Sequence, residues 1–111
     1  MSDAESIAQV LRDVSAIIRE LEGQHGQAIS QHRRLAKLWS AYLDTNITET
    51  DAAVMLALLK ISRIAESVCP PSDSFLDLIG YAAIATTCAN ETRASASSNN
   101  GGEAGADKLS D

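Results

Sequence analysis

The chain has 111 residues, a net charge of −6 and a sequence pI near 4.7; 45% of its residues are hydrophobic but only 4% are aromatic. This length suits one domain with one core, and the acidic balance argues against a nucleic-acid binder that depends on positive charge. No apolar run reaches the roughly 18 residues of a membrane span, and MSDAES does not resemble a secretory leader. We therefore expect a cytoplasmic protein without membrane contact, in which Cys69 and Cys88 are reduced.

The first predicted helix runs from about residue 3 to Glu22. Ser2 and Glu5 have the spacing of a capping box, in which a hydroxyl and an acid three residues later satisfy free backbone N–H groups. Gly23 is expected to end the helix. Its apolar residues recur at alternating intervals of four and three: Ile7, Leu11, Val14, Ile18 and Leu21. Such a stripe suits packing within a bundle, which we favour, or a seam between subunits.

A second helix is predicted from about Gln27 to Leu43, with an outer, solvated face that carries Arg33, Arg34 and Lys37. Trp39 is a candidate base-stacking residue, although a core anchor whose indole N–H finds a partner is the simpler interpretation. Two histidines, His25 and His32, lie near the start of this helix, but no cysteine or acid completes a zinc-binding set with them.

The third helix is predicted at 49–67, because Thr48 and Asp51 supply a fresh N-terminal cap. Pro70 and Pro71 cannot continue it. Ser72 or Ser74 is expected to cap a fourth helix that extends to about Asn90. Both of these helices are apolar on nearly every side, which predicts that they are buried against several neighbours.

After Thr92 the composition changes to small and polar residues, which cannot bury enough apolar surface to offset the entropy lost on ordering. The sequence therefore predicts a helical bundle domain at 1–92 and a disordered low-complexity tail at 93–111. The fold class we expect is all-α, a four-helix bundle whose C-terminal half is a helical hairpin.

Charged side chains lie within this apolar hairpin. If its turn lies near residue 70, Arg63 falls opposite Asp77 and Lys60 near Tyr81, while Asp73, Asp77 and Tyr81 share one helix face. Such charges must be paired when they are buried. One interpretation is that these ion pairs fix the helix register; the other is a site where the cations hold phosphate and the acids hold Mg²⁺. Gly80 hints at the close approach of a helix or a ligand.

The order of these residues resembles a phage-encoded family of small helical proteins of unknown function. The pattern is an HG pair, a tryptophan, I-T-x-x-D-x-A-x-M-x-x-x-L-K-x-x-R and D-x-x-x-D-x-x-G-Y-A-A. Its positions here are His25, Gly26, Trp39, Ile47, Thr48, Asp51, Ala53, Met55, Leu59, Lys60, Arg63, Asp73, Asp77, Gly80, Tyr81, Ala82 and Ala83. The resemblance covers roughly residues 20–90, and its K-x-x-R and D-x-x-x-D-x-x-G-Y portions are the most specific.

That family is similar, more remotely, to the all-α nucleoside triphosphate pyrophosphohydrolases of the MazG and dimeric dUTPase type. This similarity implies an oligomer, Mg²⁺ held by Asp73 and Asp77, and phosphate bound by Lys60 and Arg63. The chain departs from that superfamily because it lacks the paired E-x-x-E and E-x-x-D motifs. Three acids that might replace them, without a spacing that compels it, are Glu22, Glu49 and Asp51.

The leading expectation is a phage or prophage protein that acts on nucleotides with Mg²⁺-dependent phosphate chemistry. In that role Tyr81 would orient a ligand oxygen or a water, and His25 and Trp39 are further site candidates. The alternative is a non-catalytic binder that sequesters a nucleotide or inhibits a host or phage protein, as in anti-defence, with the charged cluster purely structural. Either protein is expected to form a homo-oligomer.

Overall fold

The computed structural model describes residues 2–68 and 72–99, with side chains through Ala96. Four helices account for nearly all of this part of the chain: α1 (Asp3–His25), α2 (Ala28–Leu43), α3 (Glu49–Glu66) and α4 (Ser72–Asn99). The described residues contain no strand, so the predicted all-α class is confirmed. None of the described helices combines the length and apolar character needed to cross a membrane.

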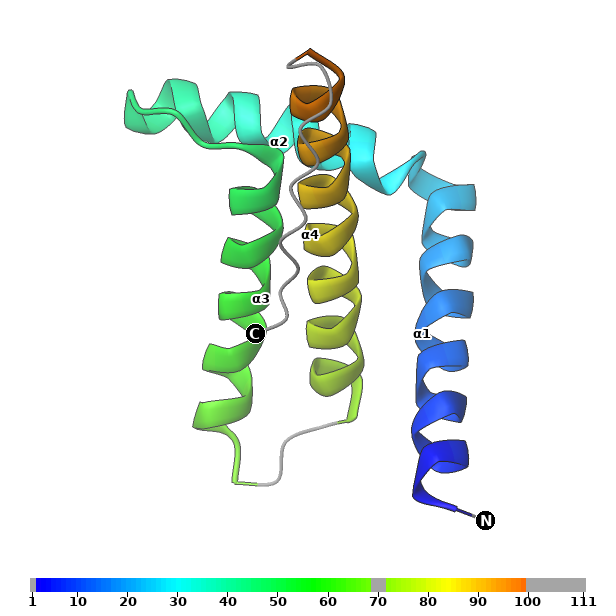
Figure 1. Cartoon of the computed structure of the whole chain (residues 1–111). Coiled ribbons are helices and arrows are strands. Elements are labelled where there is room, and N and C mark those ends of the chain that lie inside the picture. The colour runs from blue at the N-terminus through cyan, green and yellow to red at the C-terminus, as the bar shows by residue number, and fades with distance from the viewer. Residues whose placement is uncertain (1, 69–71, 100–111) are drawn as a thin grey trace.

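The helices are arranged around a central hairpin (Figure 1). α3 and α4 run antiparallel and make the most extensive contact in the molecule, as the sequence predicts. α2 crosses one end of this hairpin and packs mainly on α3, while α1 lies on the opposite side of α4 from α3 and contacts the rest of the chain chiefly through α4. α1 is therefore the least enclosed of the four helices.

Two capping boxes begin α1 and α3. The Glu5 N–H donates to the Ser2 hydroxyl and the Ser2 N–H donates to the Glu5 carboxylate, both at 3.1 Å. Thr48 and Asp51 make the same reciprocal pair at 3.0 Å. Each box satisfies N–H groups that a helix start otherwise leaves free, and both predicted helix starts are confirmed.

The corner between α1 and α2 differs from the prediction. α1 continues through Gly23 and ends at Gly26, whose φ of 94° lies in a region that side chains with a Cβ rarely adopt. Gly23 only weakens the helix, by up to about 1 kcal/mol, whereas Gly26 permits the change of direction. α2 has no side-chain cap at Gln27; the Glu22 carboxylate instead accepts the Ala28 N–H at 2.8 Å.

α4 also extends beyond its predicted end near Asn90 and continues to Asn99. The segment after Thr92 contains Arg and Ala, which favour helix, and no glycine or proline interrupts it before Gly101. The first seven residues of the predicted tail are therefore helical, and the rest of that tail lies outside the described residues.

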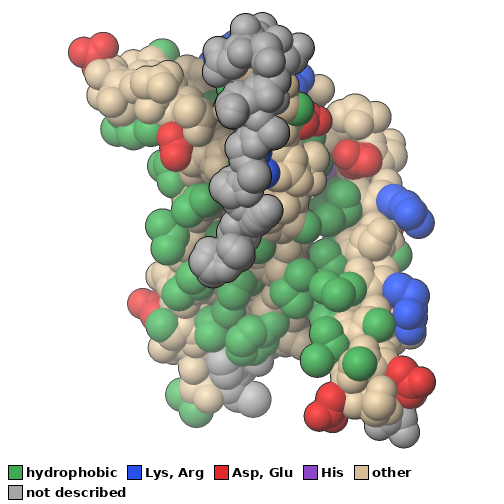
Figure 2. Space-filling model, viewed as in Figure 1, with side chains coloured by type: hydrophobic (Ala, Val, Ile, Leu, Met, Phe, Trp, Pro, Cys, Tyr) green, Lys and Arg blue, Asp and Glu red, His purple; other side chains and the backbone are tan. Residues whose placement is uncertain are grey.

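Few apolar side chains are fully buried in the part of the chain that the structure describes. The buried apolar residues of the described part are small: Val14, Ala36, Ala52, Ala53 and Cys88. By contrast, several large side chains of α3 are 43–56% exposed: Val54, Leu58, Leu59 and Ile61. The prediction that this helix is buried on most sides is therefore wrong for a single chain. Figure 2 shows apolar side chains spread over the visible faces of the helices.

Candidate functional site

The polar cluster of the hairpin contains one close ion pair. Lys60 Nζ lies 2.9 Å from Asp77 Oδ2, and the lysine side chain is only 13% exposed while that of Asp77 is 39% exposed. The sequence instead placed Arg63 opposite Asp77. Because α3 ends at Glu66 and α4 begins at Ser72, the two helices pair about one residue out of the predicted register. This shift brings Lys60 to Asp77 and leaves Arg63 exposed.

Asp73 and Asp77 occupy successive turns of α4, about 6 Å apart along the axis, with Tyr81 one turn further. Asp73 is exposed in the first turn of the helix, where an acid is also favoured by the helix dipole. The described residues contain no group of three His, Cys, Asp or Glu side chains that could hold a metal ion. Mg²⁺ often takes only one or two carboxylate ligands from the protein, and substrate phosphates and water molecules supply the others. Asp73 and Asp77 could provide two such carboxylates.

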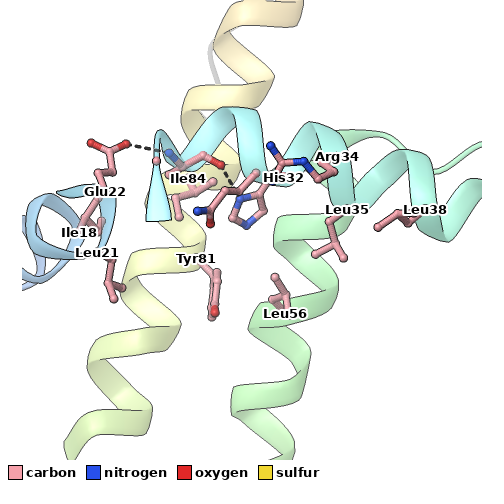
Figure 3. A pocket seen from close by; sticks show the side chains of 13 residues that line it. Ile18, Leu21, Glu22, His32, Arg34, Leu35, Leu38, Leu56, Tyr81 and Ile84 are labelled. Atoms are coloured by element: carbon pink, nitrogen blue, oxygen red, sulfur yellow. Dashed lines mark hydrogen bonds between the residues drawn. The ribbon is translucent and has the colours of Figure 1, made fainter. Parts of the chain in front are cut away.

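A cavity of about 370 Å³ opens where the C-terminal end of α1 meets α2 and the middle of α4 (Figure 3). Its size and its mainly apolar walls are typical of small-molecule sites. Its large apolar lining residues come from all four helices: Ile18, Leu21, Leu35, Leu38, Leu56 and Ile84. Five polar side chains also line it: Glu22, Gln31, His32, Arg34 and Tyr81.

His32 is the most deeply buried of these polar residues, with 6% of its surface exposed. Its Nδ1 lies 2.8 Å from the Ala28 carbonyl oxygen, and its Nε2 is a buried atom without a hydrogen-bond partner among the described residues. The ring lies 6.1 Å from the Tyr81 ring, tilted by 59° (Figure 3). A buried ring nitrogen without a partner is uncommon in proteins and calls for a ligand or a water.

A second, smaller hollow of about 70 Å³ lies between α1 and α4. It shares Ile18, Leu21, Tyr81 and Ile84 with the large cavity, and its own lining includes Asp77 and Gly80. A Cβ on Gly80 would lie 3.8 Å from Val14 Cγ1, an ordinary contact, so the close approach of α1 does not require glycine. The two hollows adjoin through these four shared residues, and together they are called the groove; Tyr81 lines both of them, and Asp77 lines only the smaller one.

A second ionic cluster ties α2 to the hairpin. Arg33 lies 3.5 Å from Glu49 and 3.1 Å from Glu91, so this residue of the predicted solvated face is exposed but paired. Cys88 is buried on α4, three residues before Glu91. Burial, together with the negative charges of Glu49 and Glu91, raises the pKa of its thiol. Half-exposed pairs of this kind contribute little each, so their main effect is to orient α2.

The remaining predicted site residues lie elsewhere. His25 is exposed at the end of α1, where its carbonyl accepts a hydrogen bond from the Gln31 side chain. Trp39 is half-buried in α2, and neither residue lines the groove. The sequence analysis named Glu22 only as a possible replacement for a missing catalytic acid, and considered His32 only as a zinc ligand; it placed neither residue in the lining of a cavity. His32 follows Ile29 by three residues and precedes Leu35 by three, which places it on the inner face of α2 and is a readable signal for a buried histidine.

Together these features define a small all-α domain with a ligand-sized groove. Residues 9–89, which include the whole lining of that groove, match the model of a domain of unknown function (DUF6378), and the chain belongs to this family. The chain is also 38% identical over 77 residues to the Gene 55 protein of Mycobacterium phage L5.

That alignment covers 68% of the chain and 49% of the phage protein, so the chain spans about half the length of the curated relative it matches. No solved structure matches the chain significantly. The resemblance to a phage-encoded family of unknown function is confirmed. The remoter similarity to MazG-type enzymes remains a prediction.

Proposed function

We propose that this is a phage-type protein of the host cytoplasm that binds a nucleotide in the groove formed by the large cavity and the smaller hollow between α1 and α4, and acts on its phosphates with Mg²⁺. The observation that supports this proposal is that the two hollows adjoin: Tyr81 lines the apolar cavity and also the smaller hollow, which is lined by Asp77, the partner of Lys60. An apolar hollow for a base beside an acid–base pair for phosphate matches the two halves of a nucleotide.

In this arrangement the phosphate end of the ligand lies against α3 and α4. Lys60 and Arg63 neutralise phosphate oxygens, and Asp73 and Asp77 hold the metal. Bound Mg²⁺ supplies positive charge that stabilises the phosphate oxygens during displacement. Because Lys60 already lies 2.9 Å from Asp77, the ammonium must move from carboxylate to phosphate as the ligand arrives. In this proposal the Tyr81 hydroxyl orients a ligand oxygen or a water.

A non-catalytic version of this proposal has its own support. The three acids that might replace the missing catalytic motifs all have structural partners: Glu22 caps α2, Glu49 contacts Arg33, and Asp51 completes the capping box of α3. A chain whose spare carboxylates are engaged in this way would suit a protein that sequesters a nucleotide and does not hydrolyse it, as an anti-defence protein would.

The test is a thermal-shift and turnover screen with nucleoside mono-, di- and triphosphates, each with and without Mg²⁺. At 100 times Kd a ligand stabilises the folded protein by about 2.7 kcal/mol, which shifts Tm visibly in a domain of this size. Asp77→Asn should abolish the Mg²⁺-dependent shift and any release of pyrophosphate. Asp44→Asn, on the exposed αL residue that ends α2, is the matched control and should change neither.

A Mg²⁺-dependent shift with turnover establishes the enzyme, and a shift without turnover establishes the sequestering protein. Absence of a shift with every nucleotide would reject both forms of the proposal.

We also propose that two copies of the chain associate through α3. Val54, Leu58 and Ile61 form an exposed stripe at intervals of four and three, and residues 52–59 of this helix carry no charge. Interface cores are depleted of charge, and obligate interfaces resemble a domain core cut in half. In a dimer with two-fold symmetry, the α3 stripe of one copy packs against the same stripe of the other copy. This contact buries the apolar side chains that are exposed in a single chain.

Sedimentation over a range of concentrations tests this dimer. Leu58→Glu should convert the dimer to a monomer, because it places a charge in the centre of the stripe. Ala41→Glu on the exposed side of α2 is the control and should leave the dimer intact. A wild-type chain that is monomeric at every concentration would contradict the proposal and leave the stripe to a different protein partner.

A further inference from the structure

We propose that His32 selects the ligand of the cavity by accepting a hydrogen bond from it, so that the cavity takes a planar heterocycle with a ring N–H or an amino group. The choice of ligand class rests on the proposed nucleotide function. The role of His32 rests on the geometry of the ring alone.

The hydrogen bond at Nδ1 sets the role of Nε2. The Ala28 carbonyl oxygen can only accept, so the Nδ1 atom, 2.8 Å away, carries the proton. In the neutral ring Nε2 then presents a lone pair, and this atom is the buried one that lacks a partner among the described residues. The backbone of α2 therefore holds the imidazole in the tautomer that offers an acceptor.

The surroundings of the ring indicate what fills the cavity. His32 lines the hollow together with Tyr81, Leu35 and Leu56, from three different helices (Figure 3). Aromatic and aliphatic walls favour a flat, mainly apolar group, and a single buried acceptor fixes its orientation. A nucleobase has this combination of a flat ring and edge donors, whereas a purely apolar ligand would leave Nε2 without a partner.

Binding of free nucleosides tests the role of His32 without involving the phosphate site. We would measure the affinity of adenosine and uridine by calorimetry, each beside an analogue whose donor is methylated: N6,N6-dimethyladenosine and 3-methyluridine. In the wild-type protein at least one parent nucleoside should bind about 5- to 150-fold more tightly than its analogue, because methylation leaves a buried acceptor unpaired.

Substitution of the histidine completes a double-mutant cycle. His32→Phe keeps the ring volume and removes the acceptor, so the ratio between parent and analogue should fall to about one. His32→Gln retains an acceptor and should restore part of the ratio. His25→Phe changes the exposed histidine outside the groove and should leave the ratio unchanged. Because the cycle compares two ligands on the same variant, a loss of stability does not obscure it.

Equal affinity of wild-type protein for parent and analogue would overturn the inference, as would a failure of every nucleoside to bind. In the second case, a Mg²⁺-dependent thermal shift with triphosphates that His32→Phe leaves unchanged would show that the phosphate site functions without base recognition. Conversely, nucleoside binding that depends on His32, without any effect of Mg²⁺ or Asp77→Asn, would reject the proposed phosphate chemistry and retain the cavity.

Discussion

The α3–α4 hairpin and α1 differ in how they are held. The hairpin combines the most extensive helix contact with an ion pair at 2.9 Å and with Ala52, Ala53 and Cys88, each 0% exposed. α1 has 23 residues but only Val14 is buried, while Ile7 and Leu11 are 60% and 53% exposed. The smaller hollow lies between the two regions, and α2 completes the lining of the large cavity. The difference teaches that the hairpin is the scaffold and that α1 forms a wall of the site with little packing of its own.

The largest expected effect comes from a charge placed inside the hairpin. Ala53→Asp buries an unpaired carboxylate between α3 and its neighbours, which costs several kcal/mol, comparable to the stability of a small domain. We expect this variant to unfold at low urea concentration or to be unfolded without it. Ala41→Asp, the same substitution on an exposed helix position, should cost less than about 1 kcal/mol. Similar midpoints for the two variants would show that the hairpin is not the scaffold.

An intermediate effect is expected when the ion pair of the hairpin is broken. Lys60→Met leaves Asp77 without its partner, and Asp77→Leu leaves the more deeply buried lysine unpaired. Each single change should lower the free energy of unfolding by about 1–3 kcal/mol. This loss is smaller than that expected for a fully buried ion pair, because the Asp77 side chain is 39% exposed. The double variant should recover most of the loss, since it buries no unpaired charge. If urea titrations show that the double variant loses as much stability as the two single variants together, the result would argue against a coupled pair.

The smallest effect concerns the contact between α1 and α4. Gly80→Ala adds a methyl group 3.8 Å from Val14 and 3.9 Å from Ile18, and it removes a glycine from a helix interior. We expect a gain of about 0.5–1 kcal/mol in thermal or urea unfolding, mainly from helix propensity. A loss of stability would mean that α1 packs on α4 more tightly than the 3.8 Å spacing implies.

The features that the sequence predicted well are local. Capping boxes need only Ser2 and Glu5, or Thr48 and Asp51, because the interacting atoms lie within one helical turn. The partner of Lys60 depends on where the hairpin of α3 and α4 is centred, and an error of one residue in this centre moves the predicted partner by two residues, slightly more than half a helical turn. Asp77 was nevertheless identified as an ion-pair residue, because a charge in an apolar helix needs a partner.

The features that the sequence did not predict depend on distant contacts. The burial of His32 Nε2 without a partner among the described residues results from the meeting of three helices. The spacing within α2 shows only that the residue faces inward. The role of Glu22 likewise depends on the corner at Gly26, which brings a carboxylate of α1 to the first N–H of α2. The sequence predicted that α3 is buried on most sides, but its apolar stripe is exposed in a single chain. The apolar pattern alone does not tell whether such residues pack against the same chain or against another one.

The corner at Gly26 has a mechanical consequence. α1 contains 23 residues and is therefore a rod about 34 Å long, attached to α2 at one end by a glycine with φ of 94°. A rotation of about 5° at this corner displaces the far end of such a rod by about 3 Å but moves Glu22, one turn from the pivot, by well under 1 Å. Such a rotation would therefore leave the wall of the large cavity nearly in place and would displace mainly the helix start near Ser2.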